Sequence, residues 1–88
     1  MPTATISTVS LRVLLFASYA ETLGFDSVEI TLDSPATVGD ALERLRALPG
    51  GEKLPPRPLC AVNLSQVSMN APVCRGDELA VLPPLAGG

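Results

Sequence analysis

Residues 11–17, with the sequence LRVLLFA, predict the strand around which the fold is built. The segment is apolar at nearly every position, which is typical of a strand covered on both faces in the middle of a sheet. A polar connection over residues 18–26 follows it. In residues 28–32 apolar and polar side chains then alternate with the period of two of a half-buried strand. The two strands are close enough in sequence to pair antiparallel.

An amphipathic helix is predicted next, because the apolar period changes from two to that of a helix. Thr37 is the expected N-cap, Asp40 favours the positive end of the helix dipole, and residues 49–51 (PGG) end the helix. A helix of this pattern usually covers one face of a sheet. Its apolar positions are Val38, Ala41, Leu42, Leu45 and Leu48.

The rest of the chain predicts short strands separated by loops. In order we expect a proline-rich loop at 53–58, a strand at 59–64, a tight turn at Ser65 and Gln66, a return strand at 67–69, a loop at 70–77 and a last strand at 78–82. A hairpin, a helix and then further strands predict an α+β fold, a β-grasp roll in which one main helix crosses a mixed sheet. The domain is expected over residues 11–82, between a flexible N-terminal segment (1–10) and a flexible C-terminal tail (83–88).

Composition indicates a protein partner and excludes several other partners. Of the 88 residues 47% are hydrophobic and 17% charged, more apolar material than so small a domain can bury. The net charge of −3 provides no basic surface for nucleic acid. No stretch approaches the roughly 20 apolar residues of a membrane span, so no membrane partner is expected either.

The chain is poorly equipped for catalysis by its own side chains. It contains no histidine, which excludes Ser-His and Cys-His nucleophiles and histidine-containing zinc sites. Cys60 and Cys74 stand apart rather than in a C-x-x-C pair; we expect no metal site and a reducing, cytoplasmic location. Cys60 is expected to be a buried hydrophobe and Cys74 an exposed, non-catalytic thiol. Asp77 is interpreted as a turn residue and Glu78 as the solvent-exposed residue that follows the turn, not as an acid–base pair.

Strand alternation predicts a surface for the partner. In the first strand Val13 and Leu15 share one face while Leu14 and Phe16 share the other; the last strand is divided in the same way. One helix can cover only one of these faces, and the uncovered one leaves an apolar patch that typically marks an interface. We therefore predict that Phe16 and Leu82 contact a partner protein.

The C-terminal tail is the strongest chemical feature of the sequence. Two prolines stiffen its departure from the sheet, and two glycines let the walls of another protein approach closely. Such a tail fits a narrow active-site tunnel, where its terminal carboxylate can be activated as an acyl adenylate. No Gly-rich phosphate-binding loop occurs in the chain, so a partner enzyme must bind the ATP. The expected tail residues are Pro83, Pro84, Leu85, Ala86 and Gly87, with Gly88 as the reacting residue.

Three segments resemble the molybdopterin synthase small subunits, a family of ubiquitin-like sulfur carriers. They are RVLLFASYAE (12–21), AVNLSQVS (61–68) and RGDELAVLPPLAGG (75–88). The resemblance implies that Gly88 is adenylated by an adenylyltransferase similar to those that activate ubiquitin, and that a sulfur donor then converts it to a thiocarboxylate. It also implies that the tail enters the large subunit of molybdopterin synthase, in a 2:2 heterotetramer, and donates sulfur to a pyranopterin precursor in molybdenum cofactor biosynthesis. The chain is then a co-substrate that binds no cofactor itself, with the catalytic residues on its partner, and Phe16 and Leu82 match the family's partner surface.

Other functions stay open at this point. The same carrier chemistry serves thiamine, cysteine or tRNA-thiolation pathways. A ubiquitin-like protein modifier that forms isopeptide bonds with lysines is a second class. A third is a plain binding module whose terminal glycines merely fray.

Overall fold

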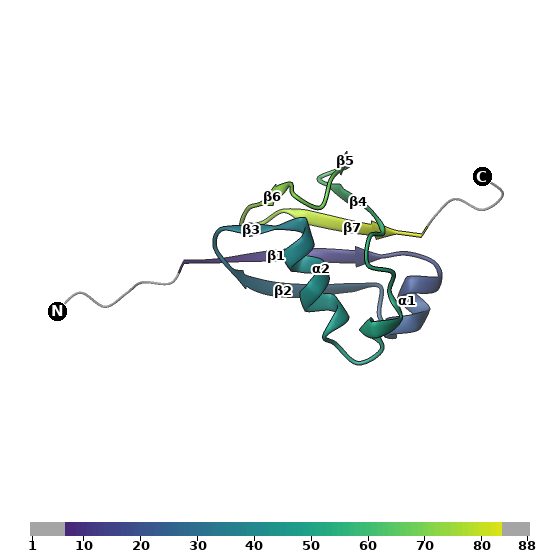
Figure 1. Ribbon diagram of the computed structural model, residues 1–88. Helices are drawn as coiled ribbons and strands as arrows, with labels where there is room; N and C mark the ends of the chain where they lie inside the picture. Colours follow the sequence, from purple (N-terminus) through teal and green to yellow (C-terminus); the bar gives the residue numbers. More distant parts are fainter. Residues whose placement is uncertain (1–6, 84–88) are drawn as a thin grey trace.

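In the computed structural model, which describes residues 7–83, one helix lies across a mixed five-stranded sheet (Figure 1). The strand order is β2-β1-β7-β4-β5, and a two-stranded sheet, β3-β6, lies beside it. The elements are β1 (Thr8–Leu15), α1 (Ser18–Leu23), β2 (Ser27–Asp33), β3 (Ala36–Thr37), α2 (Val38–Arg46), the 3-10 turn η1 (Gly51–Lys53), β4 (Leu59–Val62), β5 (Ser65–Val67), β6 (Pro72–Val73) and β7 (Glu78–Leu82).

The strand β1 lies inside the sheet, between β2 and β7, as its apolar sequence predicts, but only one of its faces is covered rather than both. It pairs antiparallel with β2 and parallel with β7, while β7 pairs antiparallel with β4. The strand begins at Thr8, so the last three residues of the predicted N-terminal segment lie in the sheet: Val9 pairs with Leu32 and is buried. The prediction did not reach these residues because Val9 is the single apolar residue among Ser7, Thr8 and Ser10, too few to show an alternation of apolar and polar side chains.

Three local predictions were wrong. Residues 18–26 contain the helix α1, which buries Tyr19 and Leu23 one turn apart and ends at Gly24 with φ 86°; six residues are too few for a clear helical period. The tight turn after β4 lies at Asn63 and Leu64 rather than two residues later, so β5 starts at Ser65. The predicted loop at 70–77 also holds the short strand β6, which pairs with β3.

The predicted cap of α2 is confirmed. The Thr37 hydroxyl accepts a hydrogen bond from the Asp40 backbone N–H (3.2 Å), and the Asp40 carboxylate accepts one from the Thr37 N–H (2.9 Å). This reciprocal capping box satisfies two backbone donors that the helix itself leaves free. The helix ends at Arg46, so Leu48, predicted as its last apolar position, follows it. The chain then doubles back at Gly51, where a Cβ would lie 2.0 Å from the Leu45 carbonyl oxygen.

The core lies between α2 and one face of the sheet, and the predicted division of the strands is confirmed. The inward residues of β1 and β7 are fully buried against the apolar stripe of α2. Within residues 7–83 no polar or charged side chain is buried, so the core is held by apolar packing alone. The central members are Val13, Leu15, Val38, Ala41, Leu42, Leu45, Leu79 and Val81.

Candidate functional site: an apolar sheet face beside the C-terminal tail

The sheet face opposite α2 carries an apolar patch at one end. Leu14 of β1 is half-buried and pairs with Ala80 of β7, and Phe16, directly after β1, has 43% of its surface exposed. Leu82, two residues beyond Ala80, is half-buried. The structure therefore leaves Phe16 and Leu82 accessible, on the strand face that the alternation identifies as uncovered.

Leu59 belongs to the same patch and was missed from the sequence. It pairs with Leu82 across β4 and β7 and is 37% exposed, while Ala61, two residues on, pairs with Ala80. The alternation of Leu59 with the buried Cys60 was visible in the sequence. Only the pairing of β4 with β7 shows that Leu59 joins the patch. We call the six residues together the open face: Leu14, Phe16, Leu59, Ala61, Ala80 and Leu82.

Charged side chains border the open face. Arg12 of β1 pairs with Glu29 of β2 on one side and with Glu78 of β7 on the other. Beside Phe16 a hollow of about 410 Å³, lined also by Leu14 and Ala20, deepens the apolar end. An apolar centre with a charged rim is the usual anatomy of a protein–protein interface.

The C-terminal tail starts at this apolar end. The strand β7 ends at Leu82, next to Leu59, and Pro83 is the last described residue. The other predicted tail residues lie outside the described residues; they are Pro84, Leu85, Ala86, Gly87 and Gly88. A protein that covers the open face is thus also placed to receive the tail.

A hydrogen-bonded junction fixes the opposite end of β7. The Asn63 side chain donates to the Asp77 carboxylate (3.0 Å) and accepts from the Glu78 backbone N–H (3.0 Å). The second Asp77 oxygen accepts from the Cys74 N–H (2.7 Å). Asp77 therefore holds two turns together, which agrees with its interpretation as a turn residue and gives the AVN and RGDE segments a structural role.

The profile of the ThiS family matches residues 13–88, most of the chain. This chain belongs to the ThiS family. It is 36% identical to the molybdopterin synthase sulfur carrier subunit of Escherichia coli (strain K12) over 89% of this chain and 99% of that protein. The resemblance noted in the sequence is thereby confirmed.

Solved structures confirm the ubiquitin-like β-grasp fold of this ThiS-family chain. The crystal structure of small archaeal modifier protein 1 from Haloferax volcanii is 29% identical, with a TM-score of 0.78 over 88% of this chain and 99% of that one. A chain from a complex of subunits 1 and 2 of the Helicobacter pylori 26695 molybdopterin-converting factor shares the fold at 20% identity and a TM-score of 0.65, covering 91% of this chain and 100% of that chain.

The two cysteines of the ThiS-family chain differ in environment, as expected. The Cys60 thiol is buried and donates to the Pro58 carbonyl oxygen (3.6 Å), whereas Cys74 is exposed. Burial raises the pKa of the Cys60 thiol from 9.0 to about 11, since the interior disfavours the thiolate. The thiolate is the nucleophile, so Cys60 is inert at neutral pH.

Alkylation tests this difference. Iodoacetamide at pH 8 is expected to modify one thiol per folded chain, Cys74, and both thiols after unfolding in guanidinium chloride. Peptide mapping by mass spectrometry locates the adducts, and Cys74→Ser is expected to leave the folded chain unmodified. Rapid modification of Cys60 in the folded chain would contradict its burial.

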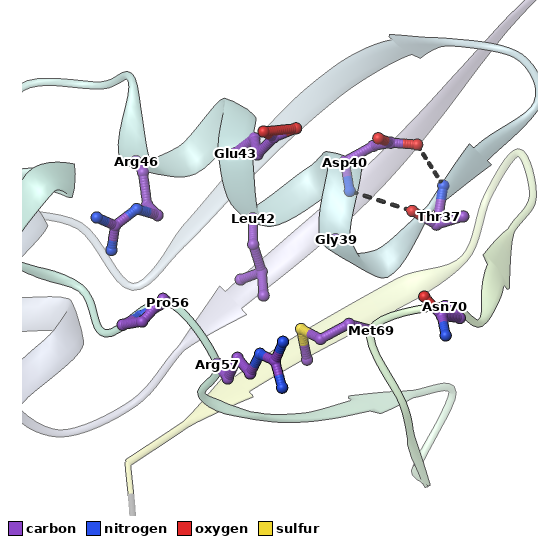
Figure 2. A pocket seen from close by; sticks show the side chains of 10 residues that line it. All are labelled: Thr37, Gly39, Asp40, Leu42, Glu43, Arg46, Pro56, Arg57, Met69 and Asn70. Atoms are coloured by element: carbon purple, nitrogen blue, oxygen red, sulfur yellow. Dashed lines mark hydrogen bonds between the residues drawn. The ribbon is translucent and has the colours of Figure 1, made fainter.

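A groove of about 460 Å³ between α2 and the loop before β4 holds several charged side chains but offers no catalytic arrangement (Figure 2). Thr37 and Asp40 are engaged in the capping box, and the Arg46 guanidinium donates to the Leu54 carbonyl oxygen. Among residues 7–83 no group of three potential metal ligands gathers, and no helix there is long and apolar enough to cross a membrane.

Loss of the Asp77 carboxylate is expected to destabilise the fold. Asp77→Ala removes the acceptor of two hydrogen bonds, and the Asn63 side-chain NH₂ loses its partner. We expect the free energy of unfolding to fall by about 1–2 kcal/mol. For a domain of this size that lowers the Tm by roughly 5–15 °C. Thermal unfolding followed by circular dichroism measures the shift, with Glu52→Ala, an exposed carboxylate in η1, as the charge-matched control. Equal Tm values for the two variants would show that the junction contributes nothing.

Proposed function

We propose that this ThiS-family chain is a sulfur carrier and the small subunit of a molybdopterin synthase. Gly88 is adenylated, converted to a thiocarboxylate, and donates its sulfur to the pyranopterin precursor in molybdenum cofactor biosynthesis. The observation that carries the proposal is the position of the open face, which ends where the C-terminal tail begins. A partner that binds the open face therefore also receives the tail. The E. coli relative, named as the sulfur carrier subunit of molybdopterin synthase, supports the choice of pathway.

The chemistry takes place at the terminal carboxyl group. A carboxylate oxygen of Gly88 attacks the α-phosphorus of ATP on the activating enzyme, and pyrophosphate leaves. A sulfur donor then delivers sulfur at the oxidation level of sulfide, which attacks the acyl carbon; the bond from that carbon to the AMP oxygen breaks, AMP leaves, and the Gly88 thiocarboxylate remains. The chain contributes the acyl group, a slim tail and a docking surface, while the partners supply the nucleotide site and the acid–base groups.

The proposed partners are the large subunit of molybdopterin synthase, a ubiquitin-activating-like adenylyltransferase and a sulfur donor. The open face, centred on Phe16, Leu59 and Leu82, provides apolar surface whose burial favours association. A chain of the same fold occurs in the H. pylori complex of subunits 1 and 2, which supports a two-protein assembly. The 2:2 stoichiometry belongs to the same proposal.

A protein modifier is the second candidate, because the H. volcanii neighbour of this chain is named a modifier. Both functions begin with the same adenylate and differ in the nucleophile that follows, a sulfur or a lysine amine. The apolar end of the sheet does not distinguish them.

Reconstitution separates the two. Chain carrying a Gly88 thiocarboxylate, mixed with the large subunit and the pyranopterin precursor, is expected to return to the carboxylate while the pterin gains sulfur. Intact-mass analysis of the proteins and of the pterin follows both. A parallel mixture contains the carboxylate form of the chain, ATP, the adenylyltransferase and the large subunit. Isopeptide adducts on lysines in that mixture, with no sulfur in the pterin of the first, would favour the modifier function instead.

A further inference from the structure

Leu64 is the most exposed large hydrophobic residue described in the chain, at 94%. It occupies the second position of the two-residue turn between β4 and β5, where Val62 pairs with Ser65. Both turn residues have positive φ, 48° at Asn63 and 75° at Leu64. A pair of positive φ angles is the signature of the type I′ hairpin turn, which strongly favours Asn-Gly.

The fold itself gives no reason for a leucine at this position. A leucine with positive φ brings its Cβ close to the backbone, a conformation that glycine adopts without strain. An exposed side chain recovers none of that strain through packing, so folding alone favours glycine at position 64. Residues held in such sparsely populated conformations are concentrated at binding sites.

The turn that carries Leu64 is rigidly held. The Asn63 backbone N–H donates to the Glu78 carbonyl oxygen (2.9 Å), and the Asn63 side chain binds both Asp77 and the Glu78 N–H. A leucine on such a platform loses little conformational freedom when a partner binds it. The flanking residues Asn63, Ser65 and Gln66 are exposed and uncharged.

We propose that Leu64 is a second anchor for the large subunit of molybdopterin synthase and inserts into an apolar socket with a polar, uncharged rim. This inference rests on the function proposed above. A single partner can reach both anchors because β4 connects them: Leu59 lies at the open face beside Leu82, and Leu64 follows the other end of the strand. Leu64 lies five residues after Leu59, so the two are at most about 17 Å apart even if the chain between them were fully extended. An interface of the standard size, roughly 800 Å² per partner, is wide enough to include both residues.

Leu64→Gly separates binding from folding, because the two change in opposite directions. Binding of the purified cognate large subunit, measured by isothermal titration calorimetry, is expected to weaken about tenfold or more. The Tm is expected to stay the same or rise by a few degrees, since the turn becomes Asn-Gly. Leu64→Met keeps an apolar side chain of similar volume and is expected to bind within about threefold of the original chain.

Leu82→Glu, measured in parallel, distinguishes failure of this inference from failure of the proposed function. If Leu82→Glu loses binding while Leu64→Gly binds as tightly as the original chain, the second anchor does not exist and the function stands. If the unmodified chain does not bind the large subunit, the proposed function and the anchor are both wrong. A lower Tm for Leu64→Gly would show that the leucine serves the fold, which also overturns the proposal.

Discussion

Deletion of Gly88 is expected to abolish thiocarboxylate formation and sulfur transfer while the domain stays folded. The acyl carbon then belongs to Gly87, about 3.5 Å short of its place in the partner's active site. A misplacement of even about 1 Å can cost on the order of 100-fold in rate, so the expected loss is larger than that. The described fold ends before this residue, and the free energy of unfolding is expected to change by less than about 0.5 kcal/mol.

The rate is measured as sulfur incorporated into the pterin per minute, and stability as the midpoint of urea unfolding. Deletion of residues 1–6, at the opposite terminus, is the matched control and is expected to leave transfer unchanged. Binding of the large subunit to the Gly88-deleted chain is expected to persist through the open face. Sulfur transfer by that chain at the normal rate would place the reacting group elsewhere in the molecule.

Substitution by glutamate at two neighbouring positions of β7 is expected to impair binding at one position and folding at the other. Leu82 lies on the open face, so Leu82→Glu is expected to leave the fold intact and to weaken association with the large subunit by 2 kcal/mol or more, roughly 30-fold. Val81 is fully buried beneath α2. An uncompensated carboxylate there costs several kcal/mol, a large part of the stability of a small domain, so Val81→Glu is expected to unfold it.

Circular dichroism reports folding and calorimetric titration reports binding. Phe16→Glu is expected to match Leu82→Glu, because the two side chains belong to the same patch. If Leu82→Glu unfolds the protein while Val81→Glu does not, the assignment of the two sheet faces is reversed. If Leu82→Glu folds and binds normally, the partner uses another surface.

Most of the fold could be predicted from strand alternation and helix period, because the position of a residue within its own strand or helix decides whether its side chain is buried. Val13 and Leu14 are adjacent and apolar, yet only Val13 is fully buried, since the single helix covers one face. The turn after β4 was misplaced because leucine is atypical at positive φ, so the sequence contained no Asn-Gly signal at Asn63 and Leu64. The helix α1 was missed because six residues carry too little periodicity.

The site was predictable only as far as it depends on local pattern. Phe16 and Leu82 followed from alternation along single strands, and the Gly-Gly tail is evident in the sequence itself. Leu59 joins the patch through the pairing of β4 with β7, and Asn63 meets Asp77 across 14 residues of chain. Such contacts depend on strand order, which single-strand patterns do not contain.

Intact-mass spectrometry tests the sulfur-carrier function most directly. The chain is incubated with ATP, its candidate adenylyltransferase and a sulfur donor, alongside a known carrier as positive control. The account predicts a mass increase equal to the exchange of one oxygen for sulfur, located at Gly88 by fragmentation. An unchanged mass, while the control carrier gains sulfur from the same enzyme, would contradict it.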